Sequence, residues 1–91
     1  MLQALIADVE AVRFTPAGVP ALNLRLQHMS QVEEVGTLRS IDVLVKSVAF
    51  GTVAERLTKQ ALGSEWKFQG FVASPRNSKQ LVFHIQDFIQ L

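Results

Sequence analysis

The chain of 91 residues contains no cysteine, which excludes a disulfide framework and a metal site built on thiolates. Charged residues make up only 19% of the chain, against ~25% in an average domain, while apolar residues make up 48%. This balance excludes a disordered chain and favours some apolar surface that a partner covers. The net charge of +1 is too small for a basic tail or a histone-like protein.

Long apolar runs are also missing. No run approaches the ~20 residues that a membrane helix needs. Asp8 and Glu10 interrupt the stretch where a signal peptide would be apolar, and the basic opening of such a peptide is lacking. We therefore expect a cytoplasmic protein. The length leaves room for one small domain, residues 1–91, with a single packed core.

Catalytic motifs are absent as well. The sequence has no glycine-rich phosphate loop, no H-E-x-x-H and no G-x-S-x-G. Asp8 and Glu10 fit a solvated strand face better than a catalytic carboxylate pair. A metal site needs three or four converging ligands, so His28 and His84 are interpreted as half-buried, hydrogen-bonded side chains. We expect no enzyme activity, no cofactor and no metal.

Alternation of apolar and polar residues dominates the first half of the chain. It predicts strands at residues 3–14 and 21–30, joined by a turn at residues 15–20, where two prolines bracket a glycine. The predicted core residues of these strands are Leu5, Ala7, Val9, Leu22, Leu24 and Leu26. The polar residues 30–38 are interpreted as a loop, and alternation predicts a third strand at residues 39–46.

The apolar period then changes to that of a helix of about three turns, with Ser47 or Thr52 as its cap and Gly63 at its end. The helical stripe comprises Phe50, Val53, Ala54, Leu57 and Ala61. Two further alternating segments, residues 65–74 and 81–89, predict the last two strands, joined by a turn-rich connection.

The order of these elements indicates the fold class. Five antiparallel strands in so short a chain would leave two long edges bare, and closing them into a barrel removes the edges. We therefore predict an all-β protein, a five-stranded oligonucleotide/oligosaccharide-binding (OB) fold barrel with one short helix between strands three and four. An SH3-like barrel would lack the mid-chain helix, and a ferredoxin-like fold would need a second one.

Several basic residues fall where an OB barrel binds its ligand. That groove is formed by strands two and three and by the loops joining strands one and two and strands four and five. Single-strand binding needs positive charge along such a groove and aromatic rings for stacking. The candidate cations are Arg13, Arg25, Arg39, Lys46, Lys67, Arg76 and Lys79. Phe71 and Phe14 are the candidate stacking rings, whereas Trp66, Phe68 and Phe83 are assigned to the core. Scattered solvated cations are the alternative.

Four segments, in order along nearly the whole chain, resemble the primosomal replication protein N (PriB) family. Residues 15–20 resemble its S/T-P-x-G-x-P turn, and residues 26–39 are similar to its L-x-H-x-S…E-E-x-G-x-x-R stretch. Residues 63–71 resemble G-S-x-x-x-x-Q-G-F, and residues 81–84 resemble the opening of its last strand.

The resemblance implies a homodimer that binds single-stranded DNA in the replication restart primosome and assists helicase reloading at stalled replication forks. It also implies two kinds of protein partner, the restart helicase PriA and the helicase-loading primosome proteins. By position, Arg13 and Arg39 match basic residues of the family. Thr37 and Asp42 stand where the family has stacking aromatics, and Met29 stands where it can have arginine.

Two classes of function therefore stay open, a DNA-binding adaptor and an OB-fold protein–protein adaptor with weak or no nucleic-acid binding. For the first, we expect a preference for single strands over duplex and little sequence preference. We also expect the first strand, Leu2–Val9, to help form the dimer seam, because a second copy can complete an unpaired edge.

Overall fold

Strands and one helix follow each other in nearly the expected order. The computed structural model describes residues 1–74 and 79–90. Its elements are β1 (Leu2–Val9), β2 (Arg13–Phe14), β3 (Pro20–Glu34), β4 (Thr37–Phe50), α1 (Thr52–Thr58), β5 (Glu65–Ala73) and β6 (Val82–Ile89). Apart from β2, a two-residue strand paired with β3, these are the five strands and the mid-chain helix that the sequence predicts.

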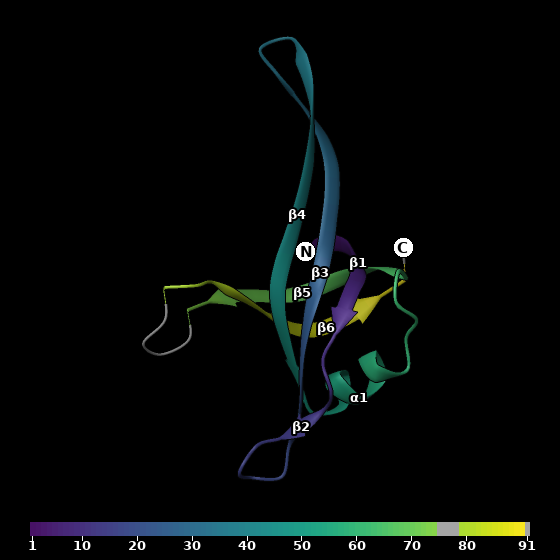
Figure 1. The fold of residues 1–91 in the computed structure, drawn as a ribbon, viewed down its shortest axis with the longest axis vertical. Coiled ribbons are helices and arrows are strands. Elements are labelled where there is room, and N and C mark those ends of the chain that lie inside the picture. The colour runs from purple at the N-terminus through teal and green to yellow at the C-terminus, as the bar shows by residue number, and fades with distance from the viewer. Residues whose placement is uncertain (75–78, 91) are drawn as a thin grey trace.

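The sheet closes on itself to form a barrel. β1 pairs with β5 and also with β3, so the strand order β1-β5-β6-β4-β3 returns to β1. The pair β4–β6 is parallel, so the expectation of five antiparallel strands is wrong at this one seam. Figure 1 shows α1 beside the lower end of the barrel, where it packs on β3, β4 and β6. This five-stranded barrel with one helix between β4 and β5 confirms the predicted OB fold.

β3 and β4 are much longer than the alternation pattern predicts. They pair antiparallel along their whole length and protrude beyond the barrel as a hairpin (Figure 1). The loop expected at residues 30–38 is therefore wrong, since only Val35 and Gly36 turn the chain. Both residues have positive φ angles, 52° and 73°. Such a two-residue turn matches the twist of paired strands, so the polar residues beside it continue as strand.

The barrel core is built from alternate residues of the strands and one side of the helix. Its largest fully buried apolar side chains are Ile6, Leu22, Leu26, Leu57 and Phe68. The prediction for β3 is confirmed, whereas on β1 the buried residues are Ala4 and Ile6 rather than Leu5 and Ala7. A register shift between Ile6 and Asp8 then lets Val9 pack against the core. Both faces of β1 are apolar, so its alternation did not identify the core face.

α1 is shorter than predicted, with seven residues. Its N-cap is Gly51 and no side chain caps it, so the prediction of Ser47 or Thr52 as cap is wrong. Phe50 belongs to the end of β4, and the helix ends well before Gly63. Of the predicted stripe, Ala54 and Leu57 are buried and Val53 packs against the core, while Phe50 and Ala61 are exposed.

β5 and β6 are joined by an irregular pairing. Gln69 pairs with Asp87 while Gly70 pairs with Ile85, so β6 has one extra residue at this point. Gly70 lies so close to β6 that a Cβ there would overlap the backbone carbonyl of His84. The bulge also bends the strand. Beyond it, Phe71 lies directly opposite His84.

Arg56 ties α1 to β6. Its Nη1 donates to Asp87 Oδ1 at 2.9 Å and its Nη2 donates to the carbonyl of Phe88 at 3.3 Å. The guanidinium also lies 4.5 Å from the centre of the Phe88 ring. The hydrogen bond from Arg56, and a second from the backbone N–H of Phe88, hold the pKa of Asp87 below its usual value of 3.8.

This lowered pKa predicts an acid-dependent contribution to stability. The ionised form of Asp87 is favoured in the folded state, so its contribution is present above the unfolded pKa and is lost as pH falls through the lower folded pKa. Asp87→Asn is expected to lower the unfolding midpoint at pH 7, and the difference from wild type should shrink below about pH 3. Thermal unfolding followed by circular dichroism across this range measures it. A difference that persists unchanged in acid would contradict this account.

Candidate nucleic-acid interface

Two of the predicted cations lie face to face on the outer surface of the barrel. Arg25 of β3 and Lys46 of β4 are directly opposite each other, and both are exposed. Residues opposite each other in an antiparallel pair have Cβ atoms about 5 Å apart, and like charges there are destabilising. Asp8 lies opposite Arg25 on the β1 side, and its Oδ1 accepts from the backbone N–H of Val9; among the described residues no ion pair joins Asp8 to Arg25. An anion bound between Arg25 and Lys46 would relieve their repulsion.

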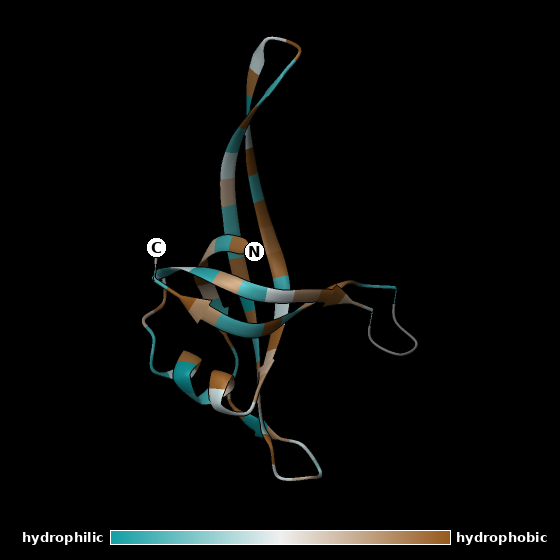
Figure 2. Ribbon diagram, turned by 180° about the vertical axis from the view of Figure 1, so that it is seen from behind, coloured by the Kyte–Doolittle hydropathy of each residue, from teal (hydrophilic) through white to brown (hydrophobic). Residues whose placement is uncertain are grey.

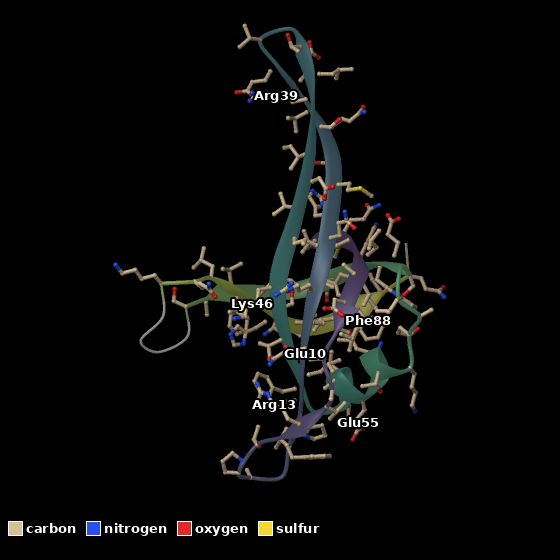
Figure 3. All side chains as sticks on the ribbon, in the orientation of Figure 1. Glu10, Arg13, Arg39, Lys46, Glu55 and Phe88 are labelled. Atoms are coloured by element: carbon tan, nitrogen blue, oxygen red, sulfur yellow. The ribbon has the colours of Figure 1, made fainter. Side chains whose placement is uncertain are left out.

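Arg13 approaches the same part of β3 from the short strand β2. Its Nη2 donates to Oδ1 of Asn23 at 3.3 Å. Figure 3 labels Arg13 and Lys46, and they come from β2 and β4 respectively. Both line one open pocket of about 320 Å³. We call it the Phe50 pocket, and it includes Arg13, Asn23, Lys46, Phe50, Val82 and His84.

Three aromatic rings form a row beside this pocket, one from each of β4, β6 and β5. The rings of Phe50 and His84 have centroids 6.3 Å apart at an interplanar angle of 28°. The rings of His84 and Phe71 are 4.9 Å apart and nearly parallel, at 6°. Phe50 is 43% exposed and Phe71 is 49% exposed, so both ends of the row reach solvent. A ring of this kind can stack with any base, since every base has a π-face.

Three of the remaining predicted cations, Arg39, Lys67 and Lys79, do not line the Phe50 pocket. Arg39 stands near the tip of the protruding hairpin (Figure 3), where its Nη1 lies 3.0 Å from Oε2 of Glu34. Lys67 is half-buried on β5, opposite Gln3 of β1. Lys79 is exposed next to Gln80, whose Oε1 accepts from Lys46 Nζ at 3.4 Å. Arg76 lies outside the described residues. The roles of these four cations stay predictions.

Sequence reasoning did not identify Phe50, His84 or Asn23 as residues of the pocket. Phe50 was counted as part of a helix, and His84 was interpreted as half-buried, which it is, but without a partner ring. Asn23 lies on the polar side of the second predicted strand, and nothing in the sequence singles it out. Phe14, a candidate stacking ring, is exposed on β2 and is not part of the row. In the alternation pattern, His84 and Phe83 point to opposite faces of their strand. The rings beside His84 belong to other strands, so only the pairing of the strands identifies them.

The described residues contain a second pocket, but no cluster of metal ligands and no helix that could span a membrane. A second pocket, of about 200 Å³, is lined by Gln3, His28 and Glu65 among others and by no lysine or arginine. Within residues 1–74 and 79–90, no three His, Asp or Glu side chains gather as a metal site would require. The one helix in this part of the chain falls short of the length needed to cross a membrane.

The proteins of similar sequence are named replication restart proteins. A family model described as "Another single-strand binding protein family" matches residues 1–87. The replication restart protein PriB of Bordetella pertussis is 41% identical over 86 residues, covering 93% of this chain and 80% of the relative. The chain belongs to the PriB family. The PriB of Nitrosomonas europaea is 33% identical over 88 residues, covering 96% of this chain and 82% of that protein.

Solved structures agree with this membership. The PriB structure from Ralstonia solanacearum aligns with a TM-score of 0.85 and 35% identity, covering 98% of this chain and 92% of that one. A deletion mutant of the single-stranded DNA binding protein from Thermus aquaticus aligns with a TM-score of 0.77 over 98% of this chain and 47% of that one. Because the sequence identity is only 16%, this likeness shows a shared fold and nothing more. The predicted PriB resemblance is confirmed.

Proposed function

We propose that this PriB-family protein is a non-catalytic, single-stranded-DNA-binding accessory protein of the replication restart primosome. It acts in the cytoplasm as a homodimer and assists helicase reloading at stalled replication forks. One observation carries the DNA-binding part of the proposal. The cations Arg25 and Lys46 lie on the same barrel face as a pocket that combines Arg13 with exposed aromatic rings.

The form of this surface favours a flexible single strand. Cations can follow the phosphates of a single strand while the rings accept its unpaired bases. A duplex hides its bases in a stack and is usually read by a helix in the major groove. Here α1 has only seven residues, and it uses Ala54 and Leu57 to cover the barrel core. The structure offers no comparable recognition element among the described residues.

Oligonucleotide binding tests this function. We expect fluorescence anisotropy to show tighter binding of a labelled single strand than of a duplex of the same length, with little dependence on sequence. If Arg13, Arg25 and Lys46 each neutralise one phosphate, the log–log slope of affinity against salt should be about −2. Equal affinity for the duplex would count against the proposal. Absence of binding to either would favour the protein–protein adaptor instead.

The first strand keeps part of each edge for a second copy. Residues 2–5 of β1 pair with β5, and residues 5–9 pair with β3 with a register shift between Ile6 and Asp8. Residues 2–4 therefore have no strand paired on one side, and residues 8–9 have none paired on the other. We expect sedimentation at micromolar concentration to give about twice the 10.1 kDa of one chain. A species of the single-chain mass under these conditions would contradict the dimer.

One observation favours protein contacts as a second role. The hairpin of β3 and β4 projects beyond the barrel and carries Met29, Leu38 and Leu44 exposed on one face. Figure 2 colours several parts of this hairpin as hydrophobic, up to the turn. Exposed apolar side chains and unpaired strand edges are typical of protein-binding surfaces. The hairpin is therefore our candidate surface for PriA or the helicase-loading primosome proteins.

A further inference from the structure

β3 has an unpaired side along the protruding hairpin (Figure 1). Its pairing with β1 ends at Leu5 and Gln27, and no other strand of the described residues lies against that side of residues 28–34. Natural proteins usually protect such an edge with lysine, proline, a bulge or a covering segment. Residues 28–32 carry no lysine, no proline and no carboxylate, and they pair with β4 without a register shift. The edge is therefore open to an added strand.

The backbone groups that face this side follow from the hydrogen bonds of the barrel. The N–H and C=O groups of successive residues point to alternate sides of a strand. The carbonyl of Asn23 accepts from the N–H of Glu10, so the odd-numbered residues of β3 point to the β1 side. Met29, Gln31 and Glu33 therefore each direct a donor and an acceptor to the unpaired side. We call these three residues the open edge.

A hollow lies at the start of the open edge, where β1 and β3 separate. At this point Nδ1 of His28 donates to the carbonyl of Gln3 at 2.7 Å, a carbonyl that strand pairing leaves free. The hollow has a volume of about 200 Å³, and Met29 and Ser30 form part of its wall. Its one charged lining residue among the described residues is Glu65. A side chain of an added strand can enter here.

Carboxylates surround the open edge. Glu65 lines the hollow, Asp42 lies on the neighbouring strand β4, and Glu33 and Glu34 lie at the outer end. Within the described residues, only Glu34 of these four has a basic partner, Arg39 at 3.0 Å. This excess of negative charge repels the phosphates of DNA and attracts a basic ligand.

We infer that the open edge binds an extended segment of a partner protein, rich in lysine or arginine, by strand addition. The backbone of the segment pairs with the open edge, and one of its basic side chains enters the hollow beside Glu65. In this mode main-chain hydrogen bonds supply affinity and side-chain pockets supply specificity. The inference rests on the protein-contact role proposed above for the hairpin. It adds the mode of binding and the chemistry of the bound segment.

The probe is a labelled peptide of about nine residues in which lysine and threonine alternate. In a second peptide, four consecutive central amides are N-methylated, which removes donors on both sides of the chain and keeps the charge. A third peptide has glutamate in place of lysine. Each is titrated by fluorescence anisotropy.

Gln31→Pro and Ser40→Pro form a matched pair of variants. The two residues lie opposite each other, and because Gln31 points away from β4, Ser40 points away from β3. Each proline therefore removes one N–H from a different free side of the hairpin, where an edge strand tolerates proline. Glu65→Gln and Glu55→Gln form a second pair, since each removes one negative charge and Glu55 lies on α1. Thermal unfolding of each variant checks that the fold is retained.

We expect wild type to bind the lysine peptide, and to bind its N-methylated form about 25-fold more weakly. Two of the lost donors face β3, and each contributes about fivefold. Gln31→Pro should weaken lysine-peptide binding about fivefold, while Ser40→Pro should leave it unchanged. Glu65→Gln should weaken it about threefold and Glu55→Gln should have no effect. The glutamate peptide should show no measurable binding.

Several results would overturn the inference. Failure of wild type to bind the lysine peptide, or equal binding of its N-methylated form, would exclude strand addition. Equal losses from Gln31→Pro and Ser40→Pro would exclude this edge. A fall of Gln31→Pro to the single-chain mass in sedimentation would assign the edge to a second copy. A fivefold loss of oligothymidylate affinity in that variant would assign it to DNA. Oligothymidylate binding by wild type decides the proposed DNA-binding function separately.

Discussion

Replacing Arg13, Arg25 and Lys46 together with alanine is expected to weaken single-strand binding about 100-fold at 0.1 M salt. A slope of about −0.7 per phosphate contact corresponds to about fivefold per contact at this concentration, and three contacts multiply to about 100-fold. The log–log slope should become shallower by about 2. Anisotropy titrations at several salt concentrations measure both quantities in one experiment.

A matched control separates local contacts from net charge. Lys46→Ala and Lys59→Ala remove one positive charge each, but Lys59 follows α1 and does not line the Phe50 pocket. We expect a loss of about fivefold for Lys46→Ala and almost no change for Lys59→Ala. Stability should change by less than about 0.5 kcal/mol in both, because both side chains are exposed. Equal losses from the two variants would show that affinity follows net charge alone.

Gly70→Ala is expected to lower the free energy of unfolding by about 3 kcal/mol, the upper part of the range for inserting atoms where there is no space. The added Cβ would overlap the backbone carbonyl of His84, and a strand backbone cannot move away as a flexible side chain can. For a domain of this size the unfolding midpoint should fall by about 15 °C. Thermal and urea unfolding followed by circular dichroism measure the effect.

Gly36→Ala is the matched control for this substitution. Gly36 has φ of +73° and no atom within 4 Å of an added Cβ, so only backbone strain of about 1 kcal/mol is expected. A cost for Gly70→Ala no greater than that for Gly36→Ala would contradict the close approach of β5 and β6. The approach matters for function because it aligns Phe71 with His84 in the ring row.

The fold could be predicted where one face of an element is clearly apolar. Leu22, Leu24 and Leu26 alternate with polar residues, and all three are buried on β3 as predicted. The length of the β3–β4 hairpin could not be predicted, because its outer half buries nothing. There the strand conformation depends on backbone pairing and on the turn at Val35 and Gly36, which leave little trace in hydrophobic periodicity.

The candidate site, too, could be predicted only in part from the sequence. Position along the chain was sufficient to select Arg13, Arg25 and Lys46, because the OB fold assigns their strands to the groove. Their proximity was not predictable, since Arg25 and Lys46 are 21 positions apart and meet only through the register of β3 and β4. The ring row draws one residue from each of three strands, so no local motif contains it.

Chemical-shift mapping tests the central claim, that a single strand binds across this face of the barrel, most directly. Backbone amide signals of the ¹⁵N-labelled protein are followed while an unlabelled oligothymidylate is added. The account predicts that the largest shifts fall on residues around Arg25, Lys46, Phe50 and His84, with little change in α1. Shifts concentrated on α1 or on the hairpin turn, with the signals around Phe50 unmoved, would contradict it.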